Sequence, residues 1–185
     1  MIRRELRPML ALATPLVVAE LGWVTMGIVD TVMVGRLGAS AIGAVGLASM
    51  LFFAVAVFAM GLLLGLDPLV AQAFGAGRLD ECHRWLIDGV WLSVLSAVPM
   101  AGVVLLVRAT LGAWGLPPDV LGLAGPYLDI LTWSLPSLLL YVAFRRYLQA
   151  INIVRPVTIV LIAANLVNAV GNWILVFGHA GAPVL

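Results

Sequence analysis

The sequence has few of the residues on which soluble enzymes depend. Of its 185 residues only 10% are charged, none is Lys, two are His and one, Cys82, is Cys. A lone Cys excludes an intramolecular disulfide. We find no Cys/His metal cluster, phosphate-binding loop, nucleophile elbow or soluble pair of catalytic carboxylates. The sequence therefore predicts no enzyme, no metal site and no organic cofactor, and the net charge of +1 without a basic patch predicts no nucleic-acid partner.

Apolar residues dominate what is present. They make up 63% of the chain, and the mean hydropathy is +1.14, whereas soluble domains are about 45–50% apolar and about 25% charged. A spanning helix needs about 20 apolar residues. Five segments reach that length, so we predict an all-α multi-pass membrane protein with the lipid bilayer as its surroundings; the segments are 10–34, 41–66, 85–107, 123–144 and 156–177.

The arginines predict how these segments are oriented. Eight of the ten lie before segment one, between segments two and three, or between segments four and five. The other two, Arg36 and Arg108, lie in the alternate loops. The positive-inside rule then places the N-terminus in the cytoplasm and the C-terminus outside, in the plasma (inner) membrane.

Two carboxylates interrupt the apolar first segment, Glu20 and Asp30. A charged side chain at the centre of a bilayer costs at least about 2.5 kcal/mol, so such a residue usually faces a partner or a wet cavity. Removal from water also favours the neutral form of a carboxyl group. Both acids are therefore candidates for carrying a proton or a cation.

The fifth segment carries three amides, Asn165, Asn168 and Asn172. At about 100° per residue they share one narrow stripe that runs about 10 Å along the helix. An amide in hydrocarbon needs a polar partner. The stripe is either interhelical packing or the wall of a polar cavity that also contains Asp30, because both helices run outward and Asp30 and Asn172 lie at similar depth.

Other polar residues have a simpler interpretation. Asp67, Asp88 and Asp129 lie near the ends of segments, where we expect them to be solvated. Cys82 lies among polar residues, and we expect it in a loop.

Four stretches resemble the multidrug and toxic compound extrusion (MATE) family. Pro15 followed by Asp30 within residues 28–38 is similar to the family's first helix, and residues 65–77 are similar to the end of its second. Residues 146–150 with Arg155 and Pro156 are similar to its fourth loop, and residues 165–178 to its fifth helix. The resemblance covers essentially the whole chain.

The resemblance implies a secondary active efflux antiporter of two six-helix bundles. Such a protein exports organic cations, drugs and other amphipathic compounds in exchange for H⁺ or Na⁺. It also implies that Asp30 binds the cation or proton, that Asn168 and Asn172 are its polar partners, and that Pro15 bends the first helix.

The sequence departs from the family in three respects. Asn172 is an acid in some members, Glu20 is neutral in many, and residues 1–185 stop before a sixth helix. We therefore expect an incomplete N-terminal lobe whose partner is a C-terminal lobe. The alternatives are a lipid-linked oligosaccharide flippase of the same superfold, which the absence of Arg from the segment interiors disfavours, and a membrane scaffold that does not transport.

Overall fold

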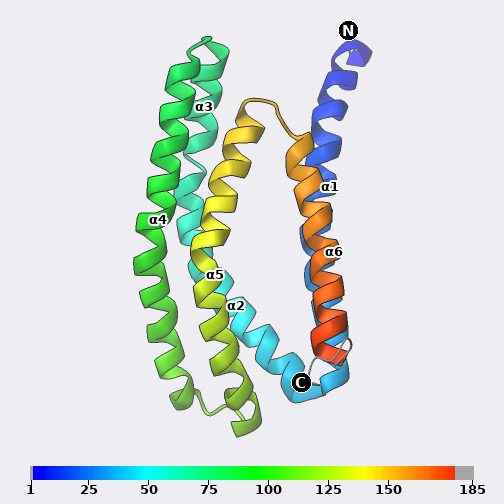
Figure 1. Ribbon diagram of the computed structural model, residues 1–185, viewed down its shortest axis with the longest axis vertical. Helices are drawn as coiled ribbons and strands as arrows, with labels where there is room; N and C mark the ends of the chain where they lie inside the picture. Colours follow the sequence, from blue (N-terminus) through cyan, green and yellow to red (C-terminus); the bar gives the residue numbers. More distant parts are fainter. Residues whose placement is uncertain (1, 178–185) are drawn as a thin grey trace. The chain divides into compact units, whose positions relative to one another are not determined.

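The structure is a computed structural model that describes residues 2–177, with side chains for residues 13–174 except Pro15, Leu16 and Ala19. Every regular element in this part of the chain is a helix, which confirms the all-α prediction (Figure 1). Two 3-10 turns, Gly35–Leu37 and Leu111–Trp114, join helices. The α-helices are α1 (Ile2–Val34), α2 (Ala39–Leu63), α3 (Leu66–Gly75), α4 (Leu79–Thr110), α5 (Pro118–Ala150) and α6 (Arg155–Phe177).

Four helical runs among the described residues are long and apolar enough to cross a membrane: Ala39–Gly75, Leu79–Trp114, Pro118–Ala150 and Arg155–Ile174. They contain the second, third and fourth predicted segments and residues 156–174 of the fifth. The first predicted segment, 10–34, lies within α1, where the side chains of residues 2–12 are among those not described.

The helices extend beyond the apolar segments that predicted them. The segment expected at 85–107 begins at Leu79 in α4, and that expected at 123–144 becomes the 33-residue α5. Apolarity marks the part of a helix that lies in hydrocarbon, whereas backbone hydrogen bonding continues past it. Cys82, expected in a loop, is therefore a buried residue of the first turn of α4.

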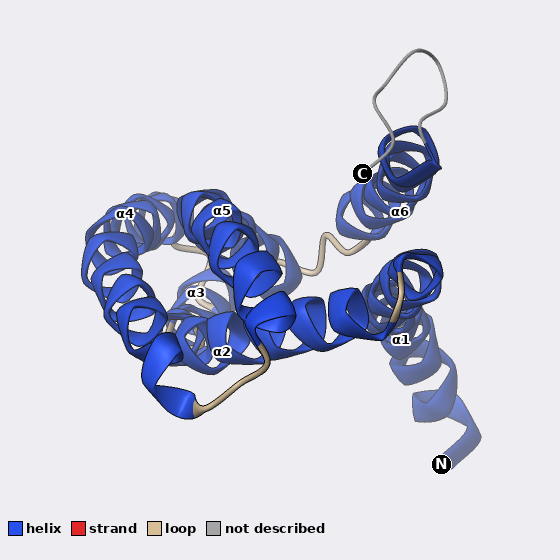
Figure 2. Ribbon diagram, turned by 90° about the horizontal axis from the view of Figure 1, so that it is seen from below, coloured by secondary structure: helices blue, strands red, loops and turns tan. Residues whose placement is uncertain are grey.

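The chain separates into two compact units. One contains α1 and α6, and the other contains α2 to α5, residues Ala39–Ile151. In the first unit α1 and α6 lie side by side, although more than a hundred residues separate them along the chain (Figures 1 and 2).

Small residues let the helices of the second unit pack closely. Ala44, Ala48, Ala56 and Ala59 of α2 are at most 1% exposed. Their spacing of three, four and eight residues places them on one face of the helix. Small residues at such an interface let backbones approach, and here the facing side chains of α5 are fully buried leucines, Leu128, Leu135 and Leu139.

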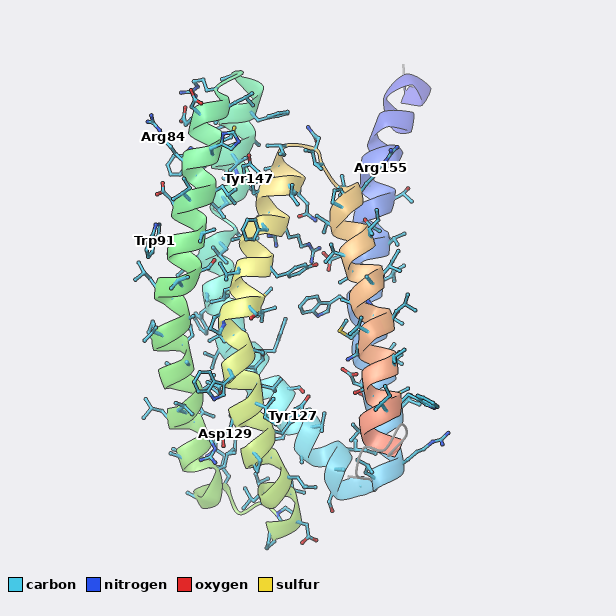
Figure 3. The ribbon with its side chains drawn as sticks, in the orientation of Figure 1. Arg84, Trp91, Tyr127, Asp129, Tyr147 and Arg155 are labelled. Atoms are coloured by element: carbon cyan, nitrogen blue, oxygen red, sulfur yellow. The ribbon has the colours of Figure 1, made fainter. Side chains whose placement is uncertain are left out.

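The inner and outer faces of α4 carry different kinds of side chain. On the inner face the Ser93 hydroxyl lies 2.8 Å from the Gly89 carbonyl oxygen and 3.2 Å from that of Leu139 on α5. On the outer face the side chains are large and apolar, and Trp91 points away from α5 (Figure 3). The inner face therefore packs against protein and the outer face suits lipid.

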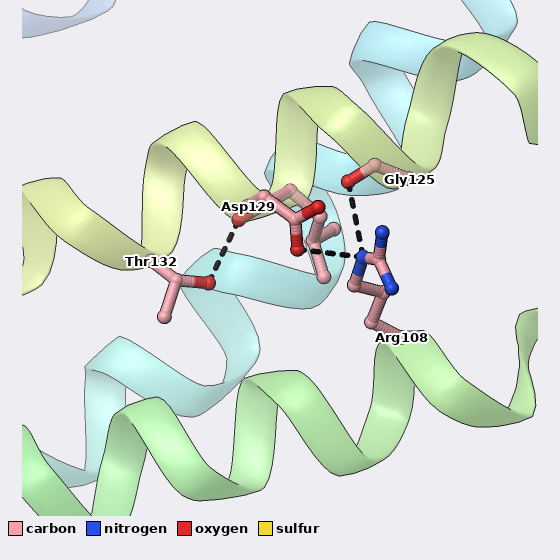
Figure 4. A network of polar contacts seen from close by, with 5 residues as sticks. Arg108, Gly125, Asp129 and Thr132 are labelled. Atoms are coloured by element: carbon pink, nitrogen blue, oxygen red, sulfur yellow. Dashed lines mark hydrogen bonds and ion pairs between the residues drawn. The ribbon is translucent and has the colours of Figure 1, made fainter.

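An ion pair joins α4 to α5 near the 3-10 turn that follows α4. Arg108 Nε lies 2.6 Å from Asp129 Oδ1, and it also donates to the Gly125 carbonyl oxygen over 3.4 Å (Figure 4). Asp129 was expected to be a solvated residue at a segment end. Its side chain is 39% exposed, in line with that expectation, but the sequence did not predict the ion pair with Arg108.

Candidate functional site

A hydrogen bond joins α1 to α6 between two of the residues singled out from the sequence. Asn172 Nδ2 donates a hydrogen bond of 2.5 Å to Asp30 Oδ1. Both side chains are partly buried, and 142 residues separate them along the chain. A carboxylate in an apolar helix is thus paired with a neutral donor on the neighbouring helix.

Asn168 extends this contact by one helical turn. Asn172 Nδ2 also lies 3.4 Å from Asn168 Oδ1, so its amide group faces acceptors on both helices. Residues four apart occupy the same face of a helix, which is why Asn168 lies beside Asn172. The structure therefore brings together Asp30, Asn168 and Asn172.

A glycine allows the two helices to approach. A Cβ atom added at Gly22 of α1 would lie 3.0 Å from Leu161 Cδ2 and 3.5 Å from Asn165 Nδ2 on α6. Eight residues further along α1, Asp30 contacts Asn172, which is seven residues beyond Asn165. The contacts advance together along both helices, so α1 and α6 are parallel, as expected of two helices that run outward.

The remaining predicted residues lie outside this contact. Asn165 faces α1 beside Gly22, but its Nδ2 donates to the Leu161 carbonyl oxygen of its own helix over 2.9 Å. Glu20 has an exposed side chain on α1, ten residues before Asp30, a distance of about 15 Å along a helix. Pro15 lies within α1, and its side chain is outside the described residues.

The groups of the site are of the kind that bind a proton or a cation. A carboxylate accepts a proton or a cation, and amide oxygens are further ligands for a hard cation. Among the described residues there is no group of three or more His, Cys, Asp and Glu that could hold a metal ion. Asn172 donates to Asp30 Oδ1, and the second oxygen of a carboxylate, here Oδ2, is also an acceptor.

The opposite side of α6 is apolar. A shallow groove of about 360 Å³ is lined by Leu166, Val167, Val170, Gly171 and Ile174. These residues lie on the face of the helix opposite the asparagine stripe. Polar and apolar functions are thus separated on the two faces of α6.

The sequence did not predict two ion pairs between helices of the second unit, Arg108–Asp129 described above and Asp67–Arg146. Arg146 Nη1 of α5 lies 3.1 Å from Asp67 Oδ2 of α3, although Asp67 was expected to be solvated. Both residues lie in stretches singled out for their family resemblance, but nothing in either stretch alone shows that the two residues meet.

Comparison with known proteins decides the family. Residues 15–174 match the family model described as MatE. This chain belongs to the MatE family. The match includes Asp30, Asn168 and Asn172, and it confirms the resemblance to multidrug and toxic compound extrusion proteins.

The MatE relatives are named as multidrug resistance proteins. Over 184 residues the chain is 34% identical to the probable multidrug resistance protein NorM of Synechocystis sp., covering 100% of this chain and 40% of the relative. Over 183 residues it is 30% identical to the multidrug resistance protein NorM of Aliivibrio fischeri, covering 99% of this chain and 40% of the relative. The chain thus spans about 40% of the length of the relatives it matches.

A solved structure shares the fold. A MOP superfamily transporter from Pyrococcus furiosus superimposes with a TM-score of 0.78 over 92% of this chain and 38% of that chain, at 19% identity. At this identity the likeness shows the fold alone. Together with the apolar helices, membership of the MatE family makes the chain a multi-pass membrane protein of a transporter family.

Proposed function

We propose that residues 1–185 form the N-terminal part of a multidrug efflux antiporter in which Asp30 is the site for the coupling ion. Entry of H⁺ or Na⁺ drives export of organic cations or amphipathic compounds, and Asn172 and Asn168 are the polar partners of the carboxylate. The observation that carries the proposal is the 2.5 Å hydrogen bond from Asn172 Nδ2 to Asp30 Oδ1. MatE membership and the names of the relatives support the wider function.

Because its polar partners are neutral amides, the Asp30 carboxylate is suited to binding and releasing a proton or a cation. A buried carboxylate paired with Arg would keep its charge permanently compensated. An amide donor stabilises the anion only in part, so a proton or a cation adds further stabilisation. When a proton arrives, the Asp30 carboxyl becomes a donor and the Asn172 amide can present its oxygen instead of its nitrogen.

Occupancy of the site is coupled to the packing of two helices. Asp30 belongs to α1 and its donor to α6, so protonation changes a contact between two helices that also pack closely at Gly22 and Leu161. A ligand shifts an equilibrium only through different affinities for two states. The α1–α6 contact supplies such a difference, because its hydrogen bond depends on the charge of Asp30.

The lengths of the relatives indicate that this chain has a partner lobe in the complete protein. Transport by alternating access in related folds uses two repeats that move around a shared site. About 60% of the length of each NorM relative lies outside the match, and we propose that the corresponding region is the partner lobe. The complete protein lies in the plasma membrane with the N-terminus of this chain in the cytoplasm.

Replacing Asp30 tests the proposal. Asp30→Asn keeps the shape of the side chain and removes its titration, so we expect efflux driven by a pH or Na⁺ gradient to be lost in the complete transporter. Asn172→Ala should weaken coupling less, since it removes a neutral donor and leaves the charge. Glu20→Gln is the matched control, because it neutralises the other acid of the apolar first segment. Efflux of a fluorescent organic cation from proteoliposomes measures all three variants.

The alternative, that Asp30 only bridges helices, predicts the opposite ranking of the Asp30 and Asn172 variants. If Asp30 only bridges helices, an amide at this position still bridges them, and Asp30→Asn retains wild-type efflux and wild-type pH dependence. Loss of coupled efflux in Glu20→Gln with normal efflux in Asp30→Asn would move the coupling site to Glu20.

A further inference from the structure

The helical run from α2 into α3 contains one turn whose backbone hydrogen bonds span three residues instead of four. Pro68 has no N–H to offer the Leu64 carbonyl oxygen, which instead accepts from Asp67 N over 3.2 Å. Gly65 N donates to the Leu62 carbonyl oxygen, also three residues back, over 3.2 Å. A local change from i−4 to i−3 bonding often marks a hinge. The turn at residues 64–65 therefore separates the ten-residue α3 from α2.

An ion pair holds α3 immediately after this turn. Asp67 lies in the first turn of α3, where the helix dipole favours a carboxylate. Its Oδ2 lies 3.1 Å from Arg146 Nη1 of α5, and the two side chains are 39% and 29% exposed. Arg146 Nε is buried and has no hydrogen-bond partner among the described residues. The guanidinium is thus held on α3 through a single carboxylate.

Three buried side chains of α3 also pack against the rest of the unit, and one of them, Leu66, belongs to the main core. Leu66 packs over Gly89 of α4, where an added Cβ would lie 2.7 Å from Leu66 Cδ1. Val70 and Ala73 are the two α3 residues of a separate small cluster with Cys82 of α4 and Tyr147 of α5. Figure 3 shows Tyr147 near the end of α5. This cluster contains four buried residues, compared with fourteen in the main core of the unit.

We propose that α3 is a hinged segment that opens about the 64–65 turn, and that the Asp67–Arg146 ion pair is its latch. The opening breaks the ion pair and the small cluster. Leu66, the α3 residue that belongs to the main core, lies beside the turn and moves least, and the other buried members of that core on α2, α4 and α5 stay packed. Local opening of a segment with few buried contacts requires less free energy than global unfolding. The latch gives this end of the unit two states, closed and open.

The native cysteine reports the opening directly. Cys82 is the only Cys in the chain and is 1% exposed. Its Sγ lies 3.8 Å from the Val70 carbonyl oxygen of α3. Two of the three other buried members of its cluster belong to α3. Displacement of α3 therefore exposes this thiol, and a thiol reagent labels it at a rate that follows the open population when closing is fast.

The experiment measures labelling of Cys82 by a small water-soluble maleimide in residues 1–185 reconstituted in lipid nanodiscs. Asp67→Asn and Arg146→Gln should each raise the labelling rate between about three- and tenfold, since each leaves the other charge without its partner. The double variant should label no faster than the faster single variant. Pro68→Ala should slow labelling below the wild-type rate, because it restores an N–H for the Leu64 carbonyl oxygen.

The second ion pair between helices of this unit is the matched control. Arg108→Gln breaks the pair with Asp129, which also joins α5 to a neighbouring helix but does not involve α3. It should leave the labelling rate of Cys82 unchanged. An equal acceleration in Arg108→Gln and Asp67→Asn would show general loosening and overturn the latch. Wild-type labelling rates in both Asp67→Asn and Arg146→Gln would also overturn it, as would faster labelling in Pro68→Ala.

Discussion

At the scale of single residues, one amide group organises the candidate site. The Nδ2 atom of Asn172 has two hydrogens and two acceptors, Asp30 Oδ1 and Asn168 Oδ1. An acid at position 172 would place two like charges within hydrogen-bonding distance, which disfavours ionisation of both. With Asn at this position, Asp30 is the single titrating group of the contact.

Gly22 controls how closely this contact can form. Gly22→Ala places a methyl group 3.0 Å from Leu161 Cδ2, and Leu161 is itself buried. Overpacking of this kind costs about 1–3 kcal/mol, so we expect α1 and α6 to separate. Spin labels at positions 32 and 167 in a Cys82→Ser background should show a longer and broader distance distribution.

Gly27→Ala is the control on the same helix. Nothing lies within 4 Å of a Cβ atom added at Gly27, and both substitutions gain the same helix propensity. Gly27→Ala should therefore leave the distance distribution unchanged. Equal distributions in the two variants would contradict the close approach of α1 and α6 at Gly22.

The residues of the site were predictable because each is expensive in an apolar helix. Asp30 stands out by its charge, and Asn168 and Asn172 stand out by their common stripe. The ion pairs of Asp67 and Asp129 were not predictable in the same way. A charge near a segment end is usually solvated, and only the facing of two helices reveals a partner.

At the scale of helices, the apolar pattern predicted which helices are present better than it predicted where each one begins and ends. The pattern identified the hydrocarbon-crossing parts of α2, α4, α5 and α6. It did not predict α3, because residues 66–75 mix apolar and polar side chains and contain Pro68. A proline is tolerated in the first turn of a helix, so Pro68 fits the start of α3, which continues the run of α2 after the 64–65 turn.

The two faces of α6 show how one helix serves two surroundings. Its asparagines point to α1, whereas its exposed apolar residues Leu166, Val167 and Val170 lie on the other side. Amides on the opposite face would be left without partners in lipid or against apolar side chains. The distribution of polar and apolar side chains therefore determines the rotation of α6 about its axis, and this rotation determines which residues contact Asp30.

At the scale of the whole molecule, the orientation of the chain in the membrane is a prediction that can be tested. The distribution of arginines predicts a cytoplasmic N-terminus. Cys82 is too buried to test it. Cysteines at the exposed Ala76 and Ala113, each in a Cys82→Ser background, are suitable probes. A membrane-impermeant maleimide added to intact cells should label position 113 and not position 76; the reverse pattern would invert the topology.

The measurement that tests the central claim most directly is the protonation of Asp30 itself. Infrared difference spectra of residues 1–185 in lipid bilayers, recorded between alkaline and acidic pH and with or without Na⁺, resolve the bands of carboxyl groups. We expect a carboxylate band that responds to acid or to Na⁺, that is absent in Asp30→Asn and that shifts in Asn172→Ala, because Asn172 donates to Asp30 Oδ1. Spectra of wild type and Asp30→Asn that respond identically to acid and to Na⁺ would contradict the assignment of Asp30 as the coupling site.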